Sequence, residues 1–429
     1  MGGGLMQLVA YGAQDIYLTG NPQITFFKVV YRRHTNFSME AIEQTWNGSV
    51  GPRNRITATI SRNGDLVHRM YLEQFTGTCA NSSTEGSLPK NYGNNIISDV
   101  ELEIGGQRID KHSGHWMETW AELTEPNPRG IKGGTEGKTQ DALSTTGTGY
   151  VQCAFPGPGK GTKYQAMALS GGTYEFKPEH STSDDAANFG ETAGAAPLDT
   201  VDSTGDLKDG TTCFIPLQFW FCRNPGLALP LIALQYHEVK VVLTMGNDLG
   251  FSDNNTKLFV DYIYLDTDER RRFAQVSHEY LIEQVQEQSL DGESKNDVVL
   301  NFNHPVKELI FSAGDKASDM GTGGLGGGNW GLKLNGHERF TPRDVKYFTR
   351  AQVWEHHTGY GAVTNPDGIG VYSFALKPEE HQPSGTCNFS RIDNAVITNT
   401  DNRKAGVCYA INYNVLRIMS GMGGLAYSN

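Results

Sequence analysis

Two histidines and a glutamate are the residues of this chain best placed for metal chemistry. His112, His115 and Glu118 recur three residues apart, so that one face of a helix would present side chains of the types that hold zinc. The pair Ser113-Gly114 interrupts the start of such a helix, because both residues favour caps and turns over a helix interior. We therefore expect neither a metal nor a cofactor at this position.

The tryptophans that follow point to packing. Trp116, Trp120 and Leu123 lie at i, i+4 and i+7, the spacing of one helical face. An aromatic shelf for a ligand would have the same spacing, but an apolar helical face more commonly packs on a core. The pattern predicts a helix that closes one end of a β-barrel.

Other short motifs match the sequence patterns of known binding or catalytic sites but lack the residues or elements that such sites need. Gly321–Gly326 reads G-x-G-x-x-G, but no helix follows it that could face a pyrophosphate. Gly159–Thr162 is similar to a phosphate loop, yet Gly161 stands where Ser or Thr must follow the lysine. His356 and His357 would point to opposite faces of a strand. With no G-x-S-x-G elbow in the sequence either, we expect a protein that is not an enzyme.

Asparagines in N-x-S/T triplets are candidate glycosylation sites. The five are Asn36, Asn47, Asn81, Asn254 and Asn388. The first six residues lack the basic and apolar regions of a secretory signal, so we expect folding in the cytosol and unmodified asparagines there.

Composition excludes several classes of partner. The net charge of −12 argues against a nucleic-acid binder, which needs a basic face to displace phosphate counterions. The sequence contains no run of 18 apolar residues, so it predicts no membrane-spanning helix. The six cysteines form no C-x-x-C pair and are expected to be free thiols, although a Cys213–Cys222 disulfide is an alternative.

The predicted strands that must position these residues occur twice along the chain, in the same order. Residues 100–109 form two strand-like runs around Gly105-Gly106, and residues 332–340 repeat them around Asn335-Gly336. The same order of strands then follows in each half. It is 214–221, 238–243 and 259–265 in the first half, and 371–376, 394–397 and 413–418 in the second.

Further runs complete each half. Residues 23–32 and 55–61 have strand patterns, and Asn63-Gly64 predicts a hairpin that returns along 66–73. In the second half the additional strands are predicted at 280–286, 298–302 and 307–312. About eight strands per half with long return connections predict two tandem antiparallel jelly rolls, an all-β fold.

The predicted organisation has an arm, two rolls and a linker. The boundaries are 1–23 for the N-terminal arm, 24–267 for the first roll, 268–277 for a charged linker and 278–429 for the second roll. A Gly-rich insertion at 126–212 nearly lacks apolar periodicity and is expected to be a surface elaboration, with short strands near 150–155 and 164–169.

Several long strings along the chain are similar to a known family. They include residues 8–28, 60–66, 100–112, 224–240, 383–395 and 412–425. On these strings the chain resembles the major capsid proteins of large icosahedral double-stranded DNA viruses, with the greatest likeness to those of chloroviruses. The resemblance runs from the first residue to the last.

The resemblance implies a structural role in the virion. It implies homotrimers with pseudo-hexagonal outline, contacts with neighbouring capsomers and minor capsid proteins, an internal membrane nearby, no direct nucleic-acid contact, and assembly in the host cytoplasm. Some members carry glycans that viral enzymes attach outside the usual triplet, so the triplets alone do not decide whether the five asparagines are modified. The long insertion at 126–212 and the short passage at 314–329 depart from the family pattern. Alternatives are therefore a special-position or minor capsid paralogue, a glycan-binding surface protein, or a cupin-like enzyme, which would need a metal.

Overall fold

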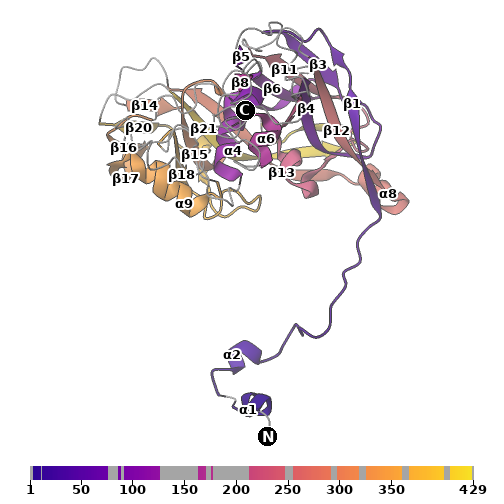
Figure 1. The fold of residues 1–429 in the computed structure, drawn as a ribbon, viewed down its shortest axis with the longest axis vertical. Helices are drawn as coiled ribbons and strands as arrows, with labels where there is room; N and C mark the ends of the chain where they lie inside the picture. The colour runs from indigo at the N-terminus through magenta and orange to yellow at the C-terminus, as the bar shows by residue number, and fades with distance from the viewer. Residues whose placement is uncertain are drawn as a thin grey trace, which may run out of the picture. The chain divides into compact units, whose positions relative to one another are not determined.

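The chain forms two compact units in the computed structural model, Met1–Phe37 and Ser38–Asn429. The model describes residues 3–10, 12–75, 86–87, 91–125, 163–170, 175–176, 212–246, 255–290, 297–317, 325–359, 367–400 and 406–427. The first unit contains two short helices, α1 (Gly3–Val9) and α2 (Ile16–Thr19). The second unit contains two β-sandwiches (Figure 1).

The strand expected over residues 23–32 is not formed, so that prediction was wrong. Ile24, Phe26 and Phe27 are 76%, 93% and 98% exposed in the first unit. A strand needs a hydrogen-bonded neighbour, and the described residues of this unit supply none. The apolar segment therefore lies open to solvent.

The first sandwich consists of two five-stranded sheets. One sheet has β1 (Phe37–Gln44), β12 (Asn255–Leu265), β4 (Leu66–Phe75), β9 (Thr212–Pro216) and β10 (Leu229–Pro230), the last two both pairing with β4. The other has β2 (Trp46–Asn47), β3 (Arg55–Thr59), β11 (Val239–Met245), β6 (Ile97–Ile104) and β7 (Gln107–Ser113). Leu72 from the first sheet and Leu102 and Leu243 from the second lie in one core.

The second sandwich is built in the same way. One sheet has β13 (His278–Ser289), β21 (Gly406–Met419), β15 (Pro305–Ala313), β18 (Ile369–Ser373), β19 (Cys387–Asn388) and β22 (Met422–Leu425). The other has β14 (Asp297–Leu300), β20 (Ala395–Asn399), β16 (Asn329–Leu334) and β17 (His337–Asp344). Leu309, Phe311 and Cys408 pack against Ile397 and Leu332 in its core.

The two sandwiches share one strand order. The order β1-β12-β4-β9 in the first matches β13-β21-β15-β18 in the second, and β3-β11-β6-β7 matches β14-β20-β16-β17. Each set of eight strands is the jelly-roll arrangement, so the predicted double jelly roll is confirmed. The remaining short strands are additions at the sheet edges, and β5 (Gly86–Ser87) pairs with β8 (Glu175–Phe176) in a separate ribbon.

Both repeated hairpins are present as predicted. Strands β6 and β7 are joined at Gly105 and Gly106, which have φ of +59° and +82°. Strands β16 and β17 are joined at Asn335 and Gly336, with φ of +51° and +81°. Positive φ at both positions is the signature of the two-residue turn that matches strand twist.

The hairpin predicted at Asn63-Gly64 is wrong. Strand β3 belongs to one sheet of the first sandwich and β4 to the other, so the chain passes between sheets here. A Cβ on Gly64 would lie 2.7 Å from Cβ of Tyr262. The glycine therefore permits close approach to a neighbouring strand and does not form a hairpin turn.

Two further predictions differ from the structure. The strand expected over 214–221 ends at Pro216, and the short helix α7 (Trp220–Arg223) follows. Residues 164–169 lie in or next to the helix α6 (Lys163–Ala168), whose Gln, Ala and Met residues favour a helix. The charged run proposed as a linker lies between β12 and β13 and is helical, as α8 (Thr267–Gln275), which Asp266 caps. The strand expected near 150–155 lies outside the described residues.

The remaining helices are short. They are α3 (Tyr92–Asn95), α4 (Gly114–Thr124), η2 (Pro225–Leu227), the π-helical turn η4 (Tyr347–Ala351), α9 (Gln352–His356) and η5 (Phe389–Arg391). In the part of the chain that the structure describes, none of the helices has the length and hydropathy to cross a membrane.

Candidate functional site

The helix α4 lies between the two rolls. It begins directly after β7, and the hydroxyl of Ser113 accepts a hydrogen bond from the backbone N–H of Trp116 as its N-cap. Trp116, Trp120 and Leu123 are buried as predicted. The helix does not close the end of one barrel, because Trp116 packs against Tyr409 of the second roll with ring centroids 5.0 Å apart.

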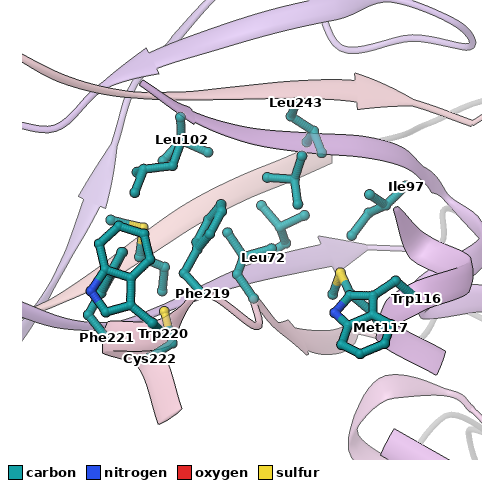
Figure 2. Packing of buried hydrophobic residues seen from close by; sticks show 14 of the residues in the cluster. Leu72, Ile97, Leu102, Trp116, Met117, Phe219, Trp220, Phe221, Cys222 and Leu243 are labelled. Carbon is teal, nitrogen blue, oxygen red and sulfur yellow. The ribbon is translucent and has the colours of Figure 1, made fainter. Parts of the chain in front are cut away.

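The apolar core of the first roll continues into the second through this contact. Figure 2 shows Trp116 and Met117 at one end of the cluster and Trp220, Phe221 and Cys222 at the other. The same cluster includes Ile310, Val371 and Tyr409 from the second roll. Continuous burial of this kind opposes separation of the two rolls.

The three side chains considered as zinc ligands have separate partners. Nε2 of His112 accepts a weak hydrogen bond of 3.5 Å from the backbone of Gln218, and burial lowers the pKa of His112 to about 3. Glu118 accepts hydrogen bonds of 2.6 Å from Asn94 and from Ser170. In the described part of the chain, no three His, Cys, Asp or Glu residues are arranged to hold a metal.

His115 serves the interface between the rolls. Its Nε2 lies 3.2 Å from the carbonyl of Ala313, and its Nδ1 lies 2.6 Å from the hydroxyl of Tyr409. Burial lowers the pKa of His115 to about 4, so the ring is neutral. Because a carbonyl only accepts, Nε2 donates to Ala313 and Nδ1 accepts from Tyr409.

A buried ionic cluster also joins the rolls. Glu283 on β13 lies 2.8 Å from Nζ of Lys307 on β15 and 3.2 Å from Nη1 of Arg223 on α7 of the first roll. Burial alone would raise the pKa of Glu283, but Arg223 and Lys307 outweigh it and lower this pKa to about 2. The Arg223 guanidinium also lies 5.1 Å above the Trp120 ring. The cluster fixes the relative position of the rolls, because charges buried in this way are costly unless paired.

A polar cavity of about 420 Å³ lies beside the same interface, between β7 and β13. Asp110 lines it and accepts hydrogen bonds from the backbone N–H groups of Lys111 and Val285. Burial, the largest cause, raises the pKa of Asp110 to about 7. Gln284 donates to the carbonyl of Ile109 across the same boundary.

The remaining candidate residues are dispersed. His357 pairs with Glu308 and Glu379, and neighbouring His356 bonds the carbonyl of Leu376. The phosphate-loop pattern at 159–162 and most of the glycine pattern at 321–326 lie outside the described residues. Cys213, Cys222, Cys387 and Cys408 are free thiols, so the alternative disulfide is not formed.

Three of the candidate glycosylation sites are accessible. Asn36, Asn47 and Asn388 are exposed, while Asn81 and Asn254 lie outside the described residues. The side-chain oxygen of Asn388 accepts a hydrogen bond from the backbone of Ser390. The glycan-binding alternative depends on the insertion at 126–212, most of which also lies outside the described residues.

The ionic residues at the interface were missed by sequence reasoning. One signal was available, since Lys307 and Glu308 stand in a strand that is otherwise apolar up to Phe311. A charged pair in such a strand indicates buried partners. Which residues those are depends on the packing of the two rolls.

Two sandwiches of one strand order, joined by a buried interface, define a double jelly-roll protein. The N-terminal half matches the model of the major capsid protein N-terminus over residues 25–266. The C-terminal half matches the model of the large eukaryotic DNA virus major capsid protein over residues 269–321 and 328–424.

Whole proteins give the same result. The chain is 50% identical to the major capsid protein of Pyramimonas orientalis virus and 38% identical to that of Paramecium bursaria Chlorella virus 1, each over the full length of both chains. The quasi-atomic model of the PBCV-1 virus capsid matches it with a TM-score of 0.69 and 33% identity, covering 94% of this chain and 100% of the other. The chain belongs to the family of major capsid proteins of large eukaryotic DNA viruses, as its sequence predicted.

Proposed function

We propose that the chain is a structural, non-enzymatic subunit that forms homotrimeric capsomers of pseudo-hexagonal outline. The observation that carries this proposal is the shared strand order of the two rolls. Three chains then bring six similar rolls into a ring, so that a threefold assembly imitates sixfold symmetry and can tile a shell. The buried interface within each chain supports this proposal, because it holds the two rolls of one chain together.

Neighbouring capsomers and minor capsid proteins are the proposed further partners, with assembly in the host cytoplasm. Support comes from the first unit, where Phe26, Phe27 and Tyr31 are 87% or more exposed. Apolar surface of this kind marks a binding segment. We assign the arm, proposed as residues 1–23, and the apolar residues up to Tyr31 to contacts with other subunits of the shell. The exposed Asn36, Asn47 and Asn388 remain proposed glycan acceptors, which peptide mass spectrometry of virions would test.

Light scattering of the purified full-length chain tests the trimer. The expected mass is about three times the 47.1 kDa of one chain. A chain lacking residues 1–23 should give the same multiple, since the sandwiches lie outside the first unit. A monomer at micromolar concentration would defeat the proposed capsomer, and loss of the trimer on truncation alone would defeat only the assignment of the arm.

A further inference from the structure

The contact between the rolls follows a simple rule. In the second roll, the sheet of β13, β21, β15 and β18 has one face in that roll's own core, with Leu309 and Phe311. The opposite face carries Ile310 and Tyr409, and these pack with Trp116 of α4. The helix that follows strand β7 of one roll therefore covers the outer sheet face of the other roll.

The first roll has an equivalent outer face. Ile310 on β15 pairs with Tyr409 on β21 and with Val371 on β18. Its counterpart is Tyr71 on β4, which pairs with Phe259 on β12 and with Pro216 on β9. The match follows from the strand register. Tyr71 lies five positions after Leu66, which pairs with the short edge strand β10. Ile310 likewise lies five positions after Pro305, which pairs with the short edge strand β19.

Aromatic side chains form a ladder on this face. The rings of Tyr71 and Phe259 are stacked with centroids 5.5 Å apart, and Phe214 lies edge-on to Tyr71 at 6.2 Å. Phe214 is 38% exposed, and Tyr71 and Phe259 are half-buried. The corresponding Tyr409 is fully buried by the neighbouring roll. The ladder thus has the composition of a covered face, and the described residues of the chain cover it only in part.

The second roll has an equivalent helix. The continuous helical segment η4–α9 begins two residues after the end of β17, and α4 begins directly after the end of β7. Lys346, Arg350 and Trp354 recur every four residues along it, so they form one stripe, and all three are exposed. Trp354 is 83% exposed. In Figure 1, α9 and β17 lie at one side of the body, and β1 and β12 lie at the opposite side.

Charged residues lie at the edges of both surfaces. Glu73 and Asp261 flank the aromatic ladder, each two residues along its strand from a ladder residue, and they add to the effect of burial, which is the largest cause that raises the pKa of Tyr71. Lys257, opposite Glu73, and Arg69, close to Asp261, give the edge of the ladder charges of both signs. Arg343 and Lys346 are exposed at the start of the helical stripe, where the two carboxylates of the ladder would be their partners in the proposed contact.

We propose that η4–α9 of one copy packs on the aromatic ladder of β9, β4 and β12 of the next copy, with Trp354 as the anchor. The inference rests on the homotrimer proposed above and identifies its contact surface. The interface between chains would repeat the one within each chain, with Trp354 in the place of Trp116. Because the two surfaces are different and lie on opposite sides of the body, the contact is head-to-tail. It closes into a trimer when successive copies are related by a threefold rotation, as the proposed capsomer requires.

A Trp354→Ala variant of the full chain tests the anchor by light scattering across a dilution series. Anchors of this type carry much of an interface's affinity, so the concentration for half-dissociation should rise about tenfold or more. The matched control is Tyr236→Ala, which removes an aromatic ring that is 76% exposed outside the proposed surface. The control should dissociate as the unmodified chain does.

A disulfide between copies tests the geometry. The double variant Trp354→Cys and Phe214→Cys should give covalent dimers and trimers on non-reducing gels after mild oxidation, while each single variant should not. An unchanged half-dissociation concentration in Trp354→Ala, or no covalent trimer from the double variant, would overturn the assigned surface and leave the capsomer intact. A monomeric unmodified chain would instead remove the proposed function itself.

Discussion

The imidazole of His357 lies 3.0 Å from a carboxylate oxygen of Glu308, and both side chains are fully buried. Its other ring nitrogen lies 3.1 Å from Glu379. Burial alone would lower the pKa of His357, but the charge of Glu308 and the hydrogen bonds to both glutamates outweigh it and raise the pKa to about 9. The ring is therefore an imidazolium at neutral pH, placed between a strand of the second roll and the loop after β18.

Raising the pH should remove this ion pair and destabilise the fold. The pKa of His357 is higher in the folded chain than the 6.5 of the unfolded chain, so the stabilisation is complete below about pH 6.5 and is lost as pH rises through 9. The loss is on the order of 3 kcal/mol. Urea unfolding at pH 6.5 and pH 9.5 measures it.

A His357→Gln variant supplies the comparison for this pH dependence. It leaves Glu308 buried without a countercharge, so it should cost about 3–5 kcal/mol at pH 7 and weaken the decline between pH 6.5 and 9.5. The exposed His337 provides the control, since His337→Gln should keep the decline of the unmodified chain. Equal declines in all three proteins would contradict the assignment.

Asp110 should make stability depend on pH in a lower range than His357 does. Its folded-state pKa of about 7 lies above the ordinary value of 3.8, so folding favours the protonated form. The contribution of Asp110 to stability is greatest below about pH 4 and falls as pH rises through 7. Asp110→Asn keeps the oxygen that accepts from Lys111 and Val285 and removes the charge.

The Asp110→Asn variant should be the more stable protein at pH 8, by an amount on the order of 4 kcal/mol, with little difference at pH 4. Thermal unfolding at the two pH values checks this. Asp99→Asn is the matched control, because Asp99 lines the same cavity but is partly exposed and paired with Lys111. A variant less stable than the unmodified chain at pH 8 would contradict the prediction.

The duplicated hairpins should respond alike to substitution. Gly106 and Gly336 have φ of +82° and +81°, and a Cβ at either would meet open space. Only the left-handed conformation opposes a side chain there, so Gly106→Ala and Gly336→Ala should each cost about 1 kcal/mol and should add in the double variant. Chemical denaturation measures both. Costs that differ strongly would show that the two turns are not equivalent.

The strand order could be predicted from sequence because it depends on local signals. Alternating runs and the turns at Gly105-Gly106 and Asn335-Gly336 locate strands and reversals without reference to the rest of the fold. Asn63-Gly64 carries an equally strong local signal, yet it joins strands of different sheets. Its glycine is required by the side chain of Tyr262, about 200 residues away, and no short window contains that information.

The interface residues escaped prediction for the same reason. Trp116 was correctly expected to be buried, but the helical pattern does not show that Tyr409 of the other roll buries it. The segment 23–32 shows the converse, because its apolar pattern predicts a strand whose partner is absent from the described residues of its unit. Local periodicity does not show which distant roll or which other chain buries a residue.

Trp116 and Trp354 lie on equivalent helices, but their replacement should affect the stability of the single chain to very different extents. Trp116 is fully buried between the rolls, so Trp116→Ala should cost about 3–5 kcal/mol through lost contacts and a residual cavity. Trp354 is 83% exposed, so Trp354→Ala should change the free energy of unfolding of the monomer by less than about 0.5 kcal/mol. Urea unfolding at concentrations low enough to give monomers separates the two. A large loss for Trp354→Ala under those conditions would mean that the side chain stabilises its own roll, and a small loss for Trp116→Ala would mean that the rolls hold together without their central ring.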